Sequence, residues 1–323
     1  MKVLGIESTA HTFGVGIIND KKILANVKNS YTTTSGGIIP VKAKEHHLNV
    51  GQKVIDDALT QANLSLKDVD LISFSASPGL APCLMAGVKF TKELKDKTGL
   101  PVVGVNHSIA HLEIGKMVSG AKDPVLLYAS GANTQIIAFE GGKYRIFGET
   151  LDQGIGNFLD SFARHIGLGF PGGPKIQELA LKSNNYIKLP YVVKGMDVSF
   201  AGILTNLKQK YDSKKYKVED LCYSTQETVF SMLIEVTERA MAHTNKDELV
   251  LGGGVACNTR LKEMSRLMCK QRNAKCFIPD NSLLVDNGVM IAYAGLLKYK
   301  ANKKEDVIDF DPNLRTDMVD VIW

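Results

Sequence analysis

The chain begins with two apolar runs separated by a short polar turn. Residues 2–6 and 13–18 are mostly apolar, and the turn at 7–12 reads Glu-Ser-Thr-Ala-His-Thr. A further strand-like stretch follows at 22–28. Short apolar runs bounded by turn residues are typical of β-strands. We therefore expect a hairpin followed by a third strand.

The same pattern recurs in the second half of the chain. Residues 125–129 and 135–139 are apolar, and the turn at 130–134 reads Ser-Gly-Ala-Asn-Thr. A third strand-like stretch follows at 143–148. The recurrence predicts that the hairpin-led unit is duplicated.

Each half then continues with a helix, followed by a strand, a turn that contains glycine, a second helix and another strand. The strand, turn and second strand occupy 69–76, 77–80 and 102–105 in the first half, and 248–251, 252–255 and 275–279 in the second half. Strands separated by helices pair in parallel through right-handed crossovers. This order predicts an α/β protein with the duplicated, two-lobed, actin-like fold of the actin/Hsp70/sugar-kinase group. Two unrelated α/β domains are the alternative.

The duplication also suggests where the lobes begin and end. We expect an N-terminal lobe at 1–120 and a C-terminal lobe at 121–323, with the linker near 119–122. The last helix, at about 288–299, is expected to pack back on the N-terminal lobe. Proteins with this plan hold a nucleotide-like substrate between their lobes.

Composition narrows the class of protein. The 323 residues are 44% apolar, enough for a core in each lobe, and no apolar run approaches the roughly 18 residues of a membrane span. A carboxylate at Glu7 comes too early for a signal peptide. None of the five cysteines forms a CxxC pair. We expect reduced thiols, no membrane association and a cytoplasmic location.

Charge permits a nucleic-acid partner without requiring one. The net charge is +5, and lysines gather at 208–217 and at 298–304. Both groups can contact phosphates. Neither contains aromatic residues at the density of a base-stacking platform, so a solvated surface is the alternative.

The two polar turns are candidates for binding phosphate. A turn rich in Ser, Thr and Gly directs several N–H groups and hydroxyls to one point, which suits an anion. Ser8 with Thr9, and Ser130 with Gly131, are such turns. The glycine turn at 252–254 lets a flat ligand approach the backbone, with Asn258 one helical turn further on. Either hairpin turn alone is more simply an ordinary turn.

His107 and His111 form a candidate metal site. They follow Asn106, a good helix N-cap, and residues four apart lie on one helix face. Both imidazoles can then reach one ion. Ser108 stands where a zinc protease has its Glu, so proteolysis lacks a base. Further ligands are expected from across the cleft, with Asp286 and Tyr128 as candidates.

Together these segments resemble the universal tRNA threonylcarbamoyladenosine (t6A) transferase family. The matching segments are Gly5 to Gly16, Asn106 to His111, Tyr128 to Gln135, Phe170 to Pro174 and Gly252 to Asn258. The His-Thr-Phe-Gly form of the first turn is similar to the archaeal and eukaryotic branch, the catalytic subunit of the KEOPS complex. The resemblance runs from Met1 to Trp323.

The resemblance implies a reaction, a metal and a set of site residues. The reaction is transfer of a threonylcarbamoyl group from threonylcarbamoyl-adenylate to N6 of adenosine 37, in tRNAs that read ANN codons. It implies one divalent metal ion per subunit, Fe or Zn. Its metal ligands fall on His107, His111, Tyr128 and Asp286. Its substrate contacts fall on Tyr128, Ala129, Ser130, Gly131, Ala132, Asp160, Gly173, Gln177 and Asn258, to which we add Thr9 and Gly253 from the turns.

The chain departs from the family pattern at several positions. Ala132 stands where the family usually has Gly, Gln177 where it usually has Glu, and Lys42 where it usually has Arg. Glutamine at 177 keeps a hydrogen bond to a ribose hydroxyl but loses the charge. These departures bear on affinity more than on the reaction.

Two other functions fit parts of the pattern. An ATP-dependent small-molecule kinase or ATPase of the same superfold needs a carboxylate base near the first turn, and Glu7 is available in sequence. A non-catalytic tRNA-binding scaffold does not need His107 for modification.

The resemblance also implies partners. They are tRNA, the adenylate or ATP, an atypical kinase-like subunit and a small dimerising subunit of KEOPS. A fused kinase domain is a further possibility.

Overall fold

The computed structural model describes residues 1–33, 36–301 and 307–323. The strands are β1 Lys2–Glu7, β2 Thr12–Asn19, β3 Lys22–Ser30, β4 Leu71–Ser77, β5 Val102–Asn106, β6 Val125–Ala129, β7 Thr134–Glu140, β8 Lys143–Glu149, β9 Val193–Lys194, β10 Asp197–Val198, β11 Glu248–Gly252 and β12 Lys275–Phe277. The helices are α1 Pro40–Ala62, α2 Ala81–Thr98, α3 His107–Ser119, α4 Ile155–His165, α5 Gly173–Ala180, α6 Ala201–Asp212, α7 Val218–Thr244, α8 Thr259–Gln271, α9 Asn281–Leu284 and α10 Gly288–Lys300. Short 3₁₀ turns occupy Leu66–Asp68, Gly254–Cys257 and Thr316–Met318.

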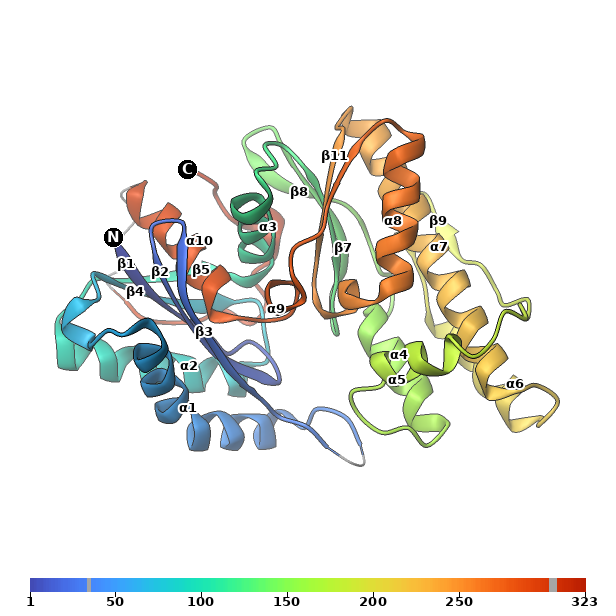
Figure 1. Ribbon diagram of the computed structural model, residues 1–323, viewed down its shortest axis with the longest axis horizontal. Helices are drawn as coiled ribbons and strands as arrows, with labels where there is room; N and C mark the ends of the chain where they lie inside the picture. The colour runs from blue at the N-terminus through green and yellow to red at the C-terminus, as the bar shows by residue number, and fades with distance from the viewer. Residues whose placement is uncertain (34–35, 302–306) are drawn as a thin grey trace.

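Two five-stranded sheets repeat one topology (Figure 1). The first has the order β3-β2-β1-β4-β5 and the second the order β12-β11-β6-β7-β8. In each, three antiparallel strands lead into two parallel strands: β1 pairs with β4 as β6 pairs with β11. The predicted duplicated α/β fold is therefore confirmed.

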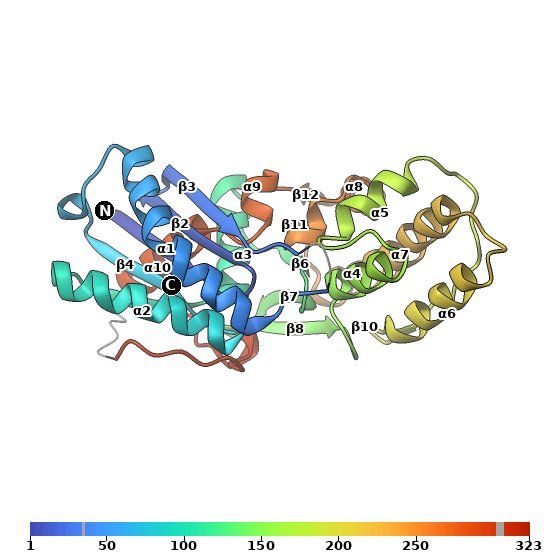
Figure 2. The ribbon, with the colours of Figure 1, turned by 90° about the horizontal axis from the view of Figure 1, so that it is seen from below.

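Helices cover both faces of the first sheet. Helices α1 and α2 pack on one face, and α10 packs on the other. The second sheet has α7 on one face and α3 on the opposite face. Alternate residues of β6 pack on opposite faces of the sheet. Leu127 packs in the core that includes α7, and Leu126 packs with Ile109 and Leu112 of α3. Seen from below, the two sheets lie side by side with α3 between them (Figure 2).

Three glycines allow α10 to lie directly on the first sheet. Gly5 in β1 and Gly16 in β2 are opposite one another. A Cβ on Gly16 would lie 2.1 Å from Val289 N, and a Cβ on Gly288 would lie 2.0 Å from Gly16 N. Because real Cβ atoms do not approach so closely, this contact requires glycine. The helix start is thereby fixed against the sheet, two residues after Asp286. The lobe boundary at residue 120 stays a prediction.

The second half contains elements that the sequence patterns did not predict. Helices α4 and α6 and the small β9–β10 hairpin lie between β8 and β11 and extend beyond the second sheet (Figure 2). Among the described residues, no helix combines the length and apolar character needed to cross a bilayer.

Candidate metal centre and surrounding residues

His107 and His111 lie on the first turns of α3, directly after β5. The Asn106 side chain caps the helix by accepting from the N–H groups of Ser108, at 3.0 Å, and Ile109, at 3.2 Å. Because the cap starts the helix at His107, both histidines lie on the same face. Both are buried, and their ring centroids are 4.8 Å apart.

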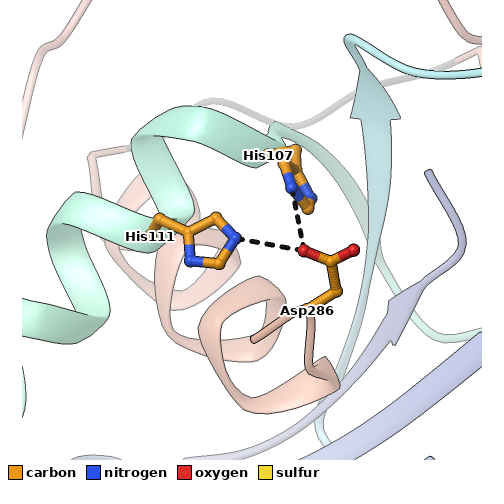
Figure 3. Close-up of side chains that lie close together, drawn as sticks. All are labelled: His107, His111 and Asp286. Atoms are coloured by element: carbon orange, nitrogen blue, oxygen red, sulfur yellow. Dashed lines mark hydrogen bonds and ion pairs between the residues drawn. The ribbon is translucent and has the colours of Figure 1, made fainter. Parts of the chain in front are cut away.

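Asp286 reaches the two imidazoles from the loop between α9 and α10 (Figure 3). Its Oδ1 lies 3.4 Å from His107 Nε2 and 3.3 Å from His111 Nε2. The three ligand atoms lie within 4.8 Å of one another. The side chain of Asn287 accepts from Met290 N at 3.0 Å and caps α10, which orients the loop. Two nitrogens and one carboxylate oxygen therefore converge on one point.

Burial and charge oppose one another at this cluster. Burial alone would raise the pKa of Asp286, but the adjacent imidazoles hold it well below its usual range. Burial would lower the pKa of His107, but its neighbours Tyr128, Glu7 and Asp286 raise it well above the ordinary value. Burial lowers the pKa of His111. The charges around His107 therefore stabilise a positive charge at this position.

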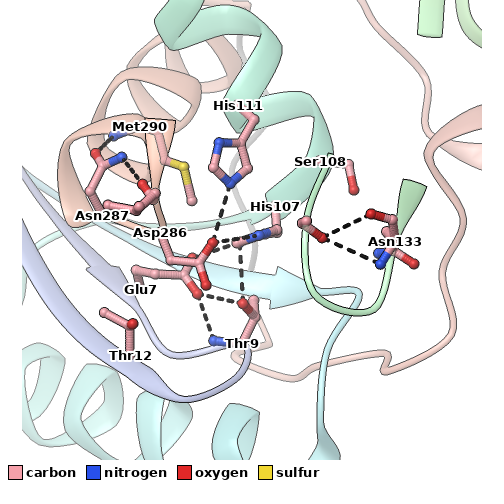
Figure 4. A network of polar contacts seen from close by, with 12 residues as sticks. Glu7, Thr9, Thr12, His107, Ser108, His111, Asn133, Asp286, Asn287 and Met290 are labelled. Atoms are coloured by element: carbon pink, nitrogen blue, oxygen red, sulfur yellow. Dashed lines mark hydrogen bonds and ion pairs between the residues drawn. The ribbon is translucent and has the colours of Figure 1, made fainter. Parts of the chain in front are cut away.

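Glu7, at the end of β1, contacts the other ring nitrogen of His107 (Figure 4). Its Oε2 accepts from His107 Nδ1 at 2.9 Å. Its Oε1 accepts from both the N–H and the hydroxyl of Thr9, each at 2.6 Å. Both carboxylate oxygens are thus engaged, which leaves Glu7 poorly placed as the base of a kinase reaction. Thr9 Oγ1 also lies 3.2 Å from His107 Nδ1.

Tyr128 ends β6 beside the two histidines. Its ring centroid is 5.0 Å from that of His111 and 6.3 Å from that of His107. The side chain is buried, and burial raises the pKa of its phenol. The structure brings Tyr128 next to His107, His111 and Asp286. Its role as a fourth metal ligand stays a prediction.

The second polar turn packs against the glycine turn that follows β11. Ser130 N and Oγ both donate to the Asn133 carbonyl, which closes the turn. Gly253 has φ +88°, and a Cβ there would lie 2.4 Å from Ala129 O. The start of α4 closes the other side, since Gly156 N donates to Ser130 O. Residues 129–132 and Gly253 therefore form one backbone-lined unit.

The remaining predicted substrate residues lie on α4, α5 and α8. Asp160 accepts from Gly172 N at 2.7 Å, beside Gly173, and its burial raises the pKa of the carboxyl. Gln177 accepts from Thr259 N at 2.9 Å, adjacent to Asn258. Asn258 donates to Gln226 and caps α8 through its Oδ1. Gln177 and Asn258 thus lie together, but both ends of the Asn258 amide already have protein partners.

Sequence reasoning missed two partners of these residues. Glu7 was considered only as a kinase base, although a carboxylate at the end of a buried strand is itself a signal of a bonded partner. Gln226, in the middle of α7, carried no signal. Of the lysines at 298–304, Lys303 and Lys304 lie outside the described residues.

Comparison with known proteins identifies the family. The family described as tRNA N6-adenosine threonylcarbamoyltransferase matches residues 22–293. The protein of that name from Thermococcus kodakarensis is 55% identical over the full length of both chains, and that from Thermofilum pendens is 48% identical over 100% of this chain and 97% of its own. A probable bifunctional tRNA threonylcarbamoyladenosine biosynthesis protein from Methanosarcina barkeri is 48% identical, and 99% of this chain matches 59% of that protein.

Solved structures with low identity share the fold. Full-length HypF in its phosphate- and nucleotide-bound form has a TM-score of 0.64 at 11% identity, covering 94% of this chain and 47% of that one. The activator of 2-hydroxyisocaproyl-CoA dehydratase from Clostridium difficile, with bound ADPNP, has a TM-score of 0.56 at 12% identity, covering 94% of this chain and 97% of that one. With a family match over most of the sequence and full-length relatives above 50% identity, this chain belongs to the tRNA N6-adenosine threonylcarbamoyltransferases and is an enzyme that forms t6A in tRNA.

Proposed function

We propose that this chain transfers a threonylcarbamoyl group from threonylcarbamoyl-adenylate to N6 of adenosine 37 in tRNA, at a centre where His107, His111 and Asp286 hold a divalent metal ion. The observation that carries the metal site is the convergence of two imidazole nitrogens and one carboxylate oxygen within 4.8 Å. Family membership supports the reaction.

The residues present fit a divalent transition metal. Imidazole and carboxylate ligands suit Zn or Fe, and Tyr128, beside the three converging residues, is the proposed fourth ligand. Asp286 Oδ1 faces Nε2 of both histidines, while Nδ1 of His107 is held by Glu7. A neutral His107 that donates from Nδ1 directs its Nε2 lone pair at this oxygen, which is favourable only with a cation or proton between them. Buried His111 Nδ1 also has no hydrogen-bond partner among the described residues.

In the proposed reaction, a C–N bond forms between N6 of the adenosine and the carbamoyl carbon. The bond from that carbon to the adenylate phosphate oxygen breaks, N6 gives up a proton, and AMP leaves. The metal ion, when bound, supplies a Lewis acid for the polar groups of the substrate. No side chain needs to become covalently attached.

Binding of the adenylate is assigned to the residues around the backbone-lined unit. Ser130 N is bonded to the Asn133 carbonyl, so the backbone amides of Gly131, Ala132 and Gly253 are the proposed donors to a phosphate, which needs no full positive charge. Asp160, Gly173, Gln177 and Asn258 are assigned to the adenosine. Thr9 is assigned to the edge of the metal centre, because its hydroxyl contacts both Glu7 and His107. Tyr128 lies between the metal centre and this unit.

Partners follow from the same family. Fused relatives carry the name of a bifunctional t6A biosynthesis protein, and this chain matches 59% of their length. We take this to support a kinase-like partner, either fused or separate, together with the small dimerising subunit of KEOPS. A cytoplasmic location is consistent with a tRNA substrate.

The metal proposal predicts that His107→Ala and His111→Ala each lose bound metal and t6A formation while the fold is retained. Removing one of the four predicted ligands should lower metal affinity and activity by more than the 10–100-fold that is typical for loss of a ligand's hydrogen-bond partner. Metal content by mass spectrometry and modified-nucleoside analysis of tRNA, incubated with adenylate, this chain and its partners, are the measurements.

The matched control is His165→Ala. His165 also faces an aspartate, Asp212 at 2.8 Å, but lies outside the cluster. It should keep both metal and activity. Normal activity in a metal-free double variant of His107 and His111 would contradict the proposal, and unchanged modification in either single variant would favour a tRNA-binding scaffold.

A further inference from the structure

We propose that Glu7 is a positioning residue of the metal centre, whose carboxylate holds Nδ1–H of His107 and thereby fixes Nε2 as the nitrogen that faces the metal. This inference rests on the proposed metal-binding function of His107. It gives a role to a buried acid that the predicted ligand set does not include.

The first observation is the placement of Glu7. It is the last residue of β1, the central strand of the first sheet, and its side chain is fully buried. Oε2 lies 2.9 Å from His107 Nδ1, whereas Asp286 faces the other ring nitrogen, Nε2 (Figure 4). Burying a carboxylate is costly unless it is hydrogen-bonded, so this contact needs a structural or functional reason.

The second observation is that Thr9 immobilises the carboxylate. Oε1 accepts from Thr9 N and from Thr9 Oγ1, each at 2.6 Å. The two oxygens therefore have different partners: one is held by the turn after β1, and the other is directed at His107. With Oε1 held in this way, rotation of the carboxylate away from His107 would break two hydrogen bonds.

The consequence concerns the tautomer of His107. A neutral imidazole carries one proton, and the ring nitrogen that is hydrogen-bonded to an acceptor keeps it. With Nδ1–H directed at Glu7, the lone pair lies on Nε2, which faces Asp286 Oδ1 at 3.4 Å. A carboxylate that accepts from a ligating histidine orients the ring and increases its basicity. Glu7 thus orients His107 so that Nε2 is the nitrogen available to the metal ion.

The test compares metal binding by the full chain and by Glu7→Gln. Glutamine has nearly the same shape but offers one oxygen and one NH₂ group. Either the NH₂ faces the Thr9 donors, or it faces His107 and favours the proton on Nε2. Titration of the metal-free chain with Zn²⁺ against a chromophoric chelator should show affinity about 10–100-fold weaker than wild type. Titration with Co²⁺ should show an altered visible absorption spectrum.

The matched control is Glu248→Gln. Glu248 is a buried acid at the start of β11 that accepts from Lys122 N at 2.7 Å and Asp123 N at 3.1 Å and contacts no histidine. Its Zn²⁺ affinity should equal that of wild type. Melting temperatures of the metal-free proteins verify folding. If Glu7→Gln does not fold, Thr9→Val, which removes the hydroxyl bonded to Oε1, should weaken Zn²⁺ binding in the same direction.

The outcomes separate this inference from the proposed function. If a folded Glu7→Gln variant has the same Zn²⁺ affinity and Co²⁺ spectrum as wild type, the role of Glu7 is overturned and the metal site stays intact. The same result in Thr9→Val, used if Glu7→Gln does not fold, has the same meaning. Failure of the wild-type chain to bind either ion would overturn the metal site itself.

Discussion

Two buried histidines, His107 and His47, meet opposite surroundings. His107 is faced by Glu7 and Asp286, whose charges outweigh burial. His47, in α1, donates from Nε2 to the Ala10 carbonyl at 2.9 Å, and its other nitrogen lies 3.3 Å from His46. Burial lowers the pKa of His47 to about 4, with small opposing and reinforcing effects from Ala10, His46 and His11. Nearby negative charges therefore decide the protonation of His107, whereas burial decides that of His47.

The lowered pKa of His47 predicts acid sensitivity of the fold. The unfolded chain binds a proton at this residue near pH 6.5, but the folded chain binds it only near pH 4. Above pH 6.5, His47 therefore makes its full contribution to the free energy of unfolding. This contribution, up to roughly 3 kcal/mol, is lost as pH falls through 4. Urea unfolding of wild type and His47→Gln between pH 8 and pH 4 measures this loss.

The value at pH 8 serves as the internal control. There the difference between wild type and His47→Gln reports only the lost hydrogen bond and packing. The gap between the two stabilities should narrow as pH falls from 6.5 to 4. Curves that stay parallel over this range would show that His47 does not titrate as its burial implies.

At the scale of elements, the position of Asp286 depends on how α10 meets the first sheet. Gly5 and Gly16 remove the side chains that would hold α10 away from β1 and β2. The loop before α10 then ends at the metal cluster, where Asp286 reaches both histidines of α3. One packing contact therefore supports both the core of the first lobe and the third ligand.

Gly16→Ala should separate α10 from the sheet. Its Cβ would lie 2.1 Å from Val289 N and 2.4 Å from Gly288 C, both backbone atoms that cannot rotate away. Overpacking of this kind typically costs about 1–3 kcal/mol, and here we expect the upper end or beyond. Displacement of α10 should also weaken Zn²⁺ binding through Asp286. Chemical denaturation and metal titration measure the two effects.

Gly202→Ala is the control for this substitution. Gly202 lies in α6, and a Cβ there has no atom within 4 Å. Alanine in a helix is favoured over glycine by about 0.5–1 kcal/mol, so this variant should be more stable and bind metal normally. Equal effects of the two substitutions would mean that the close contact at Gly16 does not hold α10 in place.

For the whole molecule, the surface charge bears on how tRNA is held. The net charge is +5, and the lysine group at 208–217 lies around the α6–α7 connection. Tyr216 lies in this group, with Lys210 Nζ 4.9 Å from its ring. One such pair is not a series of stacking surfaces, and sequence-specific recognition of an RNA loop needs splayed bases on aromatic or arginine planes.

We therefore predict that the chain alone binds and modifies tRNA poorly and that partner subunits supply part of the tRNA surface. Phosphate contacts provide most of the non-specific affinity, and each adds to the salt dependence. Titration of tRNA with the isolated chain and with the reconstituted complex at matched salt should show tighter binding, a steeper salt dependence and faster t6A formation for the complex. Equal affinity and turnover in both preparations would mean that the chain is self-sufficient.

Local patterns in the sequence were enough to predict the strands of the two five-stranded sheets, the duplicated hairpins and the histidine pair of α3. Each depends on a few neighbouring residues: a short apolar run bounded by turn residues, or a four-residue spacing after the Asn106 cap. The prediction of α10 as the last helix also came from a local apolar pattern. The helices α4 and α6 were missed, because no element in the repeated unit of the first half marked their place.

Tertiary structure decided which of these residues meet. Asp286 is 175 residues from His111, and Glu7 is 100 residues from His107. Their contacts arise because β1 and β5 belong to one sheet and because α10 returns to that sheet on three glycines. The protonation of His107 likewise depends on charges brought together only by folding. Sequence thus determined the ligand types and their local spacing. Long-range packing determined which residues meet at the metal centre, because the sheet, and not the neighbours along the chain, sets the distances between remote segments.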